Sequence, residues 1–412
     1  MADPELLTRA PCSGRTRAKL TASAADEDGL TKNRAPSPLN LSSVPNKVRC
    51  MVREASSTVR SLRCKSSTVP NTPNNHLVME RRQSATPNIT PKVKYEDLEG
   101  MEYIGSGNFA DVYKAELRGQ TVAVKISKTT ERENVSQLWS EQAILAEVSH
   151  MNCINILGKG STPEDESRPF IVLEYLEGGD MKFYLNKEMQ RKKSFVGILF
   201  GGSRQGKFGG PRFQQRLDLC LQLARALAYA HHNCLSAKGQ ALLHRDLKPA
   251  NLLLCAGGRL VLADFGMAKA QNTFSASGGM DDPFTMTGET GTLRYMAPEN
   301  ARCEPYGTAV DTYSFGVLAW QILTLKVPYK DVTTDTFMDR VVHNDERPPI
   351  PKEWPLALGQ LLQRCWAPDA NDRPPMGQVK AELEIVKNEL LNNTQVPLLH
   401  TLWIHNTGSG SV

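Results

Sequence analysis

Asp246, Asn251 and Asp264 lie close together in the sequence and have the side chains that a phosphoryl-transfer site needs. A carboxylate such as Asp246 can orient a hydroxyl group and accept its proton. Carboxylate and amide oxygens bind hard divalent cations, so Asn251 and Asp264 are candidate Mg²⁺ ligands. Lys248, two residues after Asp246, can balance negative charge on a γ-phosphate. Each residue alone has an ordinary alternative role, such as a turn residue or a helix cap, but their order and spacing favour catalysis.

A glycine-rich stretch lies much earlier in the chain. Glycines at its spacing let the backbone of a hairpin approach phosphate groups, with N–H groups facing the ligand. A strand-like run follows it, whereas a dinucleotide-binding loop would open a helix. Taken alone, such a stretch is more often a simple turn between strands. As a phosphate-binding loop it would comprise Ile104, Gly105, Ser106, Gly107, Asn108, Phe109, Ala110 and Val112.

A lysine and a glutamate could hold the phosphates in position. Lys125 ends the apolar run 122–124, which is typical of a strand. Glu141 lies in the stretch 135–148, where the sequence predicts a helix, and it precedes the apolar Leu145 by one helical turn. An ion pair between Lys125 and Glu141 would keep the ammonium group beside the α- and β-phosphates. Without that partner, Lys125 would be an ordinary exposed strand end.

These motifs, in this order, resemble the signature set of the eukaryotic protein kinase domain. The resemblance covers residues 95–390 and implies an α+β fold of two lobes, with a small β-rich N-lobe and a larger helical C-lobe. It implies ATP and Mg²⁺ as cofactors and proteins as substrates. Asp246, Lys248, Lys125 and Glu141 would be the catalytic residues, with Asn251 and Asp264 as metal ligands.

Further residues match the family pattern in the C-terminal half. Glu299, in Met296-Ala297-Pro298-Glu299, resembles the end of an activation segment, and Arg373 resembles its usual ion-pair partner. Asp311 resembles the buried carboxylate that braces the catalytic loop from below. We expect the Glu299–Arg373 pair to be structural.

The resemblance also implies how ATP would be held. The stretch 171–176 is similar to the strand that enters the hinge between the lobes, with Leu173 guarding the back pocket. The Glu174 carbonyl and the Leu176 N–H would bind adenine, and Asp180 would reach the ribose. The apolar side chains above and below the adenine ring would be those of Val112, Ala123 and Leu253.

The sequence gives mixed signals on whether serine, threonine or tyrosine hydroxyls accept the phosphate. Lys248 in the catalytic loop and Thr292 in the stretch 291–296 resemble serine/threonine kinases, whereas the stretches 311–317 and 365–374 resemble the tyrosine-kinase-like group. We therefore predict a serine/threonine kinase of that group. A dual-specificity or tyrosine kinase is an alternative.

A pseudokinase scaffold that binds nucleotide without turnover is a second alternative. It is disfavoured because Lys125, Asp246 and Asp264 are all present. The departures from the family pattern are Ala110 in place of a glycine and Cys153 in place of an isoleucine, together with an insertion. None of them removes a group that the chemistry needs.

A phosphorylation switch is also implied. Family resemblance assigns Arg245, directly before the catalytic aspartate, as the receptor of a phosphate on the activation segment. That segment runs from Asp264 to Glu299 and is rich in threonine. Thr287 lies closest to the expected position of the phosphate and Thr290 comes second, so an upstream kinase acting on either is a predicted partner. Incidental phosphorylation of an exposed loop is the alternative.

Charge and composition set residues 1–94 apart. Residues 1–95 hold 16 lysines and arginines against 7 acidic residues, a balance of +9, whereas the remainder carries −4. The region is rich in serine, threonine and proline and lacks apolar periodicity, which predicts disorder. Its charge suggests either an acidic partner or a solvated linker. A rival hypothesis makes this region the main functional module. Its pairs that resemble proline-directed phosphorylation sites begin at Ser37, Thr72, Thr86 and Thr90.

Two other segments are predicted to lie outside the regular fold. Residues 187–213 are basic and glycine-rich, which favours a surface insertion, and residues 391–412 would form a short C-terminal tail. The chain has no run of 18 apolar residues and no secretory signal, and its nine cysteines lack zinc-ligand spacing. These features predict an intracellular protein, cytoplasmic or nuclear, without a clear nucleic-acid or membrane partner.

Overall fold

The computed structural model describes residues 90–107, 109–163, 168–193, 210–235, 238–272 and 293–404. The chain divides into two compact units, Met1–Asn75 and His76–Val412, and every described residue lies in the second. Residues 1–89, for which we predicted disorder, lie outside the described residues. None of the described helices is both long and apolar enough to span a bilayer.

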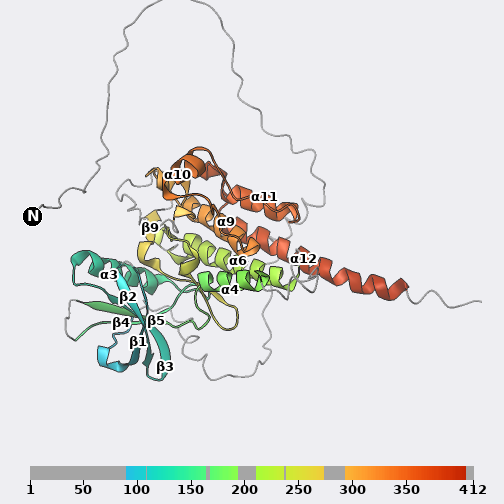
Figure 1. The fold of residues 1–412 in the computed structure, drawn as a ribbon. Coiled ribbons are helices and arrows are strands. Elements are labelled where there is room, and N and C mark those ends of the chain that lie inside the picture. Colours follow the sequence, from blue (N-terminus) through green and yellow to red (C-terminus); the bar gives the residue numbers. More distant parts are fainter. Residues whose placement is uncertain are drawn as a thin grey trace, which may run out of the picture. The chain divides into compact units, whose positions relative to one another are not determined.

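A five-stranded antiparallel sheet forms the N-lobe, with helix α3 (Arg132–Glu147) packed beside it (Figure 1). The strands follow the order β1-β2-β3-β5-β4, which leaves β4 at one edge. Helix α3 begins three residues before the predicted stretch 135–148. The strands are β1 (Leu98–Ser106), β2 (Ala110–Leu117), β3 (Gln120–Ser127), β4 (Ile156–Ser161) and β5 (Pro169–Glu174).

Helices dominate the C-lobe, as the sequence predicted (Figure 1). They are α4 (Met181–Lys193), α6 (Pro211–Tyr229), α8 (Pro298–Ala301), α9 (Ala309–Thr324), α10 (Thr334–Phe337), α11 (Leu356–Cys365) and α12 (Met376–Ile404). Two short two-stranded antiparallel sheets pair β6 (Gln240–Leu243) with β9 (Lys269–Asn272) and β7 (Leu252–Leu254) with β8 (Leu260–Leu262). The catalytic loop lies between β6 and β7.

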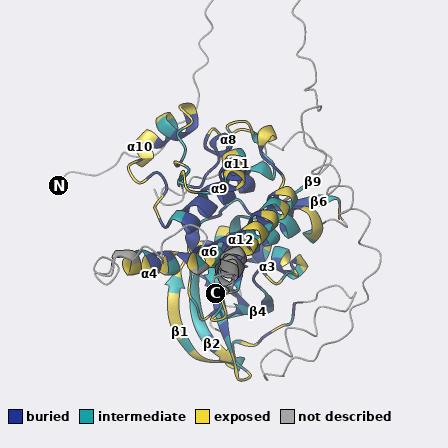
Figure 2. Cartoon of the chain, turned by 90° about the vertical axis from the view of Figure 1, so that its right-hand side faces the viewer, coloured by how far each residue is buried: buried dark blue, intermediate teal, exposed yellow. Residues whose placement is uncertain are grey.

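Helix α9 is the centre of the C-lobe core. Every residue from Val310 to Leu323 is buried, and Figure 2 shows this helix in the colour of buried residues. A helix that is apolar on all sides must be enclosed by neighbours, and α9 contacts both α6 and α11. Asp311 therefore enters the core on a helix that has little freedom to move.

Three predicted boundaries differ from the structure. Residues 90–94, assigned to the disordered region, are ordered because Val93 is buried and hydrogen-bonded to β4. Both ends of the predicted insertion 187–213 are helical in the structure. Residues 187–193 complete α4, and residues 211–213 begin α6. Residues 187–193 contain neither glycine nor proline, and Arg191 pairs with Glu188 one turn earlier. The middle, 194–209, lies outside the described residues.

The C-terminal boundary also differs. Helix α12 continues to Ile404, so much of the predicted tail 391–412 prolongs the last helix of the C-lobe. Residues 405–412 lie outside the described residues.

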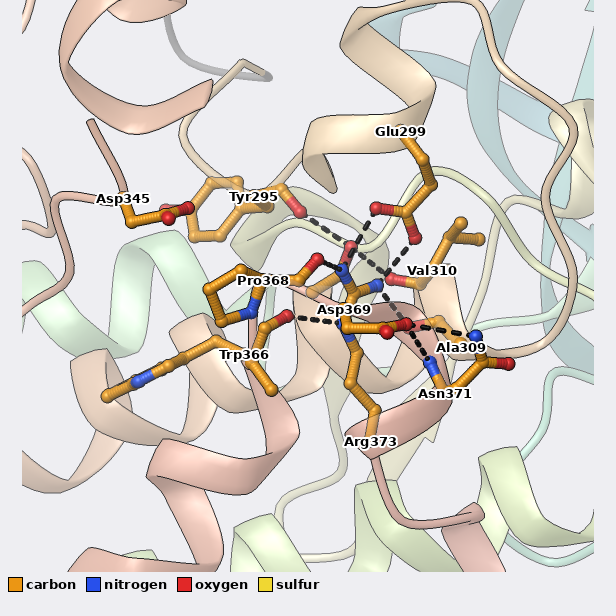
Figure 3. Close-up of polar contacts among 12 residues, drawn as sticks. Tyr295, Glu299, Ala309, Val310, Asp345, Trp366, Pro368, Asp369, Asn371 and Arg373 are labelled. Atoms are coloured by element: carbon orange, nitrogen blue, oxygen red, sulfur yellow. Dashed lines mark hydrogen bonds and ion pairs between the residues drawn. The ribbon is translucent and has the colours of Figure 1, made fainter. Parts of the chain in front are cut away.

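Arg373 and Glu299 form the expected ion pair and fix the end of the activation segment (Figure 3). The two guanidinium nitrogens donate to the two Glu299 oxygens at 2.5 and 2.9 Å. The remaining donors reach backbone carbonyls of Ala367, Pro368 and Ala309, and the Arg373 side chain is fully buried. This bidentate arrangement satisfies the whole guanidinium group.

Arg373→Ala is expected to lower the free energy of unfolding by about 3 to 5 kcal/mol, because Glu299 would be left charged, buried and unpaired. Urea denaturation of the full chain measures the change. Arg364→Ala is the matched control: its ion pair with Glu382 is partly exposed, so its loss should cost at most about 1 kcal/mol. Equal effects of the two substitutions would contradict this account of the pair.

Candidate active site

Strand register gathers the candidate adenine-binding side chains on one face of the sheet. Val112 of β2 lies opposite Lys125 of β3, and Ala123 of β3 lies opposite Leu173 of β5. Directly opposed residues in an antiparallel pair share a face. The other face of β3 is buried in the core through Val122, Val124 and Ile126. Val112, Ala123 and Leu173 are half-buried, which suits the lining of a site open to a ligand.

Lys125 connects the two lobes through two carboxylates. Its Nζ lies 2.6 Å from Glu141 Oε2 on α3 and 2.9 Å from Asp264 Oδ1 in the C-lobe. Burial lowers the pKa of the Lys125 ammonium, but attraction to both carboxylates outweighs burial, so its pKa lies above the ordinary value. Burial raises the pKa of Asp264, but Lys125 outweighs it, so that pKa is lowered. Both groups therefore stay charged near neutral pH.

Helix α3 also contacts the Asp264-Phe265-Gly266 turn directly. The Gln137 side-chain amide donates to the Gly266 carbonyl, and Phe265 is buried with its ring 5.0 Å from that of His244. Gln137 was not among the predicted site residues. The signal was present, because Gln137 precedes Glu141 by four residues and so lies on the same helical face.

The Asp246 carboxylate is held by two side chains. Its Oδ2 forms an ion pair with Lys248 Nζ at 2.8 Å and accepts a hydrogen bond from Asn251 Nδ2 at 3.0 Å. Asn251 Nδ2 also donates to the Asp246 carbonyl at 2.8 Å. The structure therefore brings together Asp246, Lys248 and Asn251, and leaves Asp246 Oδ1 as the oxygen that can approach a substrate hydroxyl.

Asp311 supports the catalytic loop from below. Its carboxylate accepts the backbone N–H of His244 at 2.8 Å and that of Arg245 at 2.9 Å, and it lies 2.9 Å from His231 Nε2. Burial raises the pKa of Asp311, but these hydrogen bonds and His231 outweigh burial, so its pKa is lowered. Arg245 has a φ of 67°, a left-handed conformation that costs a non-glycine residue energy. The contribution of His231 had no signal in the sequence.

The side chains present are suited to a divalent cation bound together with phosphates. Asn251 uses its amide nitrogen on Asp246, so its amide oxygen is the atom left for a cation, and the Asp264 carboxylate keeps an oxygen besides the one on Lys125. No cluster of three or more His, Cys, Asp or Glu side chains that could hold a metal exists within the described part of the chain. Mg²⁺ commonly binds through one or two carboxylates plus substrate phosphates and water, which matches this pair.

At the expected hinge, the Glu174 side chain is engaged within the protein, which leaves backbone groups as the candidates for binding adenine. The Glu174 carboxylate lies 3.0 Å from Arg259 and accepts the N–H of Asn155 at 2.9 Å, so its side chain is engaged within the protein. Asp180 accepts the N–H of Phe183 at 2.7 Å in the first turn of α4, and it forms an isolated antiparallel bridge with Leu253. The expected floor of the adenine site and the expected ribose contact are therefore adjacent. Leu176 is buried beside them.

The glycine-rich stretch includes the end of β1 and the start of β2. Gly107 N–H donates to the Ala110 carbonyl at 2.8 Å, and Ser106 Oγ donates to Asp111 Oδ1 at 2.7 Å. Ile104 is exposed, Phe109 is half-buried, and Gly105 lies opposite Val112. Asn108 lies outside the described residues.

The Arg245 side chain has neutral partners. Its Nε donates to the Met267 carbonyl at 2.6 Å and its Nη1 to the Tyr306 hydroxyl at 2.6 Å. Among the described residues, no ion pair involves Arg245. Tyr306 had no sequence signal as a site residue. Thr287, Thr290 and Thr292 lie outside the described residues.

Comparison with known proteins agrees with this geometry. The family model of protein tyrosine and serine/threonine kinases matches residues 98–383. Serine/threonine-protein kinase STY46 of Arabidopsis thaliana is 31% identical over 70% of this chain and 44% of its own length. Human mitogen-activated protein kinase kinase kinase 7 is 31% identical over 70% of this chain and 41% of its length. The serine/threonine/tyrosine-protein kinase HT1 of Arabidopsis thaliana is 30% identical over 68% and 64%. The chain thus spans less than two thirds of each relative.

Lys125→Met is expected to leave the protein folded and to lower phosphoryl transfer from ATP at least 100-fold, about 2.7 kcal/mol in the barrier. The ammonium group would no longer position the phosphates or balance Glu141 and Asp264. Turnover with Mg-ATP, together with circular dichroism, measures both effects. Lys128→Met, three residues further along, serves as the control. A folded Lys125→Met variant with wild-type turnover would refute this site.

Proposed function

The chain belongs to the protein tyrosine and serine/threonine kinase family, and on that basis we propose that it transfers the γ-phosphate of ATP to serine and threonine hydroxyls of protein substrates. Its sequence is similar to kinases of the tyrosine-kinase-like group. Mg²⁺ would accompany ATP, held by Asn251 and Asp264, and would balance the phosphate charge.

The arrangement around Asp246 carries this proposal. Lys248 and Asn251 both hold Oδ2, so the carboxylate is oriented before a substrate arrives. Its other oxygen can accept the proton of the attacking hydroxyl. Lys248 is close enough to Asp246 to balance charge on the transferred group, while Lys125 holds the phosphates from the N-lobe side. Alignment and charge balance are what phosphoryl transfer requires of a protein.

The oriented carboxylate of Asp246 also argues against a scaffold that only binds nucleotide. Such a protein has no need of a carboxylate that Lys248 and Asn251 orient for an acceptor hydroxyl. The relatives include enzymes named as serine/threonine kinases and others named as dual-specificity or serine/threonine/tyrosine kinases. Lys248 and Thr292 support the serine/threonine choice.

Incubation with a generic protein substrate and Mg-ATP is expected to place phosphate on serine and threonine. Phosphoamino-acid analysis of the product measures this. Asp246→Asn should abolish most of the transfer while retaining ATP binding, because Asp246 acts on the acceptor, and Asp264→Ala should abolish it by removing a metal ligand. Mainly phosphotyrosine in the product would overturn the serine/threonine assignment, and equal labelling by all three proteins would overturn kinase activity.

Activity is further proposed to depend on phosphorylation of the activation segment. The Arg245 guanidinium carries a permanent charge, yet its contacts in the described structure are a carbonyl and a hydroxyl. A phosphate on Thr287 or Thr290 adds about −1.5 to −2 charges and can form charge-assisted hydrogen bonds with such a group. Binding of this phosphate would bias the segment toward an ordered state.

Thr287→Ala, alone or with Thr290→Ala, is expected to lower activity at least tenfold, about 1.4 kcal/mol in the barrier. Arg245→Ala should lower it as well, and the two losses should not add, because they break one contact. Initial rates of the phosphatase-treated and untreated enzymes measure the effect. Full activity of the double threonine variant in both states would exclude the switch.

A further inference from the structure

Residues Thr90–Val93, here called the N-terminal strap, lie along the free edge of the N-lobe sheet. Val93 N–H donates to the Lys159 carbonyl and Lys159 N–H donates to the Pro91 carbonyl, both at 2.9 Å. Lys92 and Lys159 form a parallel bridge. The strap thus pairs with the outer side of β4, which the sheet order leaves at the edge. It precedes the part of the chain that matches the family model, which begins at Leu98.

Strand β4 is shaped to receive the strap. A Cβ atom on Gly158 would overlap Val93 Cγ2, and it would lie 3.4 Å from the Pro91 carbonyl oxygen. A Cβ atom on Gly160 would overlap the Val93 carbonyl oxygen and the ring of Phe170. Val93 itself is buried in the apolar cluster of the N-lobe. The two glycines on either side of Lys159 therefore provide the space that the strap occupies.

The strap also reaches the helix that carries Glu141. Gln142 Nε2 on α3 donates to Thr90 Oγ1 at 3.1 Å, and Gln142 Oε1 accepts from Lys159 Nζ at 3.1 Å. Lys159 Nζ also lies 5.6 Å from the ring centroid of Trp139 on the same helix. Gln142 directly follows Glu141, so the strap and β4 hold α3 beside the Lys125–Glu141 ion pair.

Thr90 is followed by Pro91, the sequence pattern that proline-directed kinases accept. We propose that Thr90 is a phosphorylation site for a separate kinase of this type and that its phosphate releases the strap from α3. In the reaction, Thr90 Oγ1 attacks the γ-phosphorus of ATP bound to that kinase, and an O–P bond forms. The bond from phosphorus to the β,γ-bridging oxygen breaks, ADP leaves, and the hydroxyl proton passes to the base of that kinase.

The burial and contacts of Thr90 determine both how another kinase reaches it and why its phosphate releases the strap. Thr90 is 6% exposed, so the strap must first open, and a segment of four residues at a sheet edge opens at small cost compared with the whole domain. The phosphate cannot return to the closed position easily. Thr90 Oγ1 there contacts Gln142, which is itself 8% exposed, and a group carrying about −1.5 to −2 charges would have to lose its water.

Release of the strap is expected to lower activity, an effect that rests on the proposed kinase function. Helix α3 would lose the Thr90–Gln142 contact on one side while Glu141 faces Lys125 on the other. The ion pair would form for a smaller fraction of the time. We expect at least a threefold lower kcat/KM after phosphorylation of Thr90.

The first experiment treats the full chain with a proline-directed kinase and Mg-ATP. Mass spectrometry measures phosphate at Thr90, and amide hydrogen exchange measures opening at Val93 and Lys159, whose N–H groups pair the strap with β4. Exchange at both amides should rise at least tenfold after phosphorylation. Thr90→Ala treated in the same way should show no such treatment-dependent rise, whereas Thr86→Ala should behave like the unchanged chain.

A second experiment opens the strap without phosphate. Gly158→Ala should speed exchange at Lys159 and raise the rate of Thr90 phosphorylation severalfold, because its methyl group displaces Val93. Gly257→Ala is the matched control, since a Cβ there meets no atom within 4 Å. The proposal is overturned if Thr90 takes no phosphate in the Gly158→Ala variant, or if phosphorylated Thr90 leaves exchange at Lys159 unchanged or slower. These readouts do not depend on the chain's own activity, so failure of the kinase function would be seen separately.

Discussion

The buried carboxylate of Asp311 is the group on which the catalytic loop depends. One side chain on the central helix α9 binds two successive backbone N–H groups, those of His244 and Arg245. Those bonds stabilise the left-handed backbone at Arg245, which a non-glycine residue adopts at a cost of order 1 to 3 kcal/mol. Asp246 follows directly, so the position of the proposed base is set by the helical core and not by the surface of the lobe.

Ion pairs to Lys125 join the N-lobe to the C-lobe. Glu141 comes from a helix beside the sheet, Asp264 follows a C-lobe strand, and Lys125 contacts both. The Glu141 carboxylate alone would be costly to bury, and its ion pair with the Lys125 ammonium group offsets that cost. The Gln137–Gly266 hydrogen bond adds a neutral contact between the same two segments. Because α3 carries Glu141, movement of α3 would change the charge next to Lys125.

Sequence reasoning reached the residues whose chemistry is fixed by type and spacing. The structure contains three such contacts: the Lys125–Glu141 pair, the Asp246–Lys248–Asn251 cluster and the Glu299–Arg373 pair. It did not reach His231 or Tyr306, because their partners are distant in sequence and many residue types could serve there. It also ended the domain too early, at residue 390, and began order too late, since strap pairing and helix continuation depend on tertiary contacts that composition does not encode.

The family model and the sheet pairing at the glycines of β4 place the start of this domain at different residues. The match to the family model starts at Leu98, but the sheet is completed only by residues from Thr90 onward. A chain divided at Leu98 would keep every motif shared with the family and would expose the outer edge of β4 together with the apolar surface that Val93 covers. Unpaired edges of this kind invite association with other chains. The segment that matches the family model is therefore shorter than the segment that completes the sheet, and only the longer one covers the outer edge of β4.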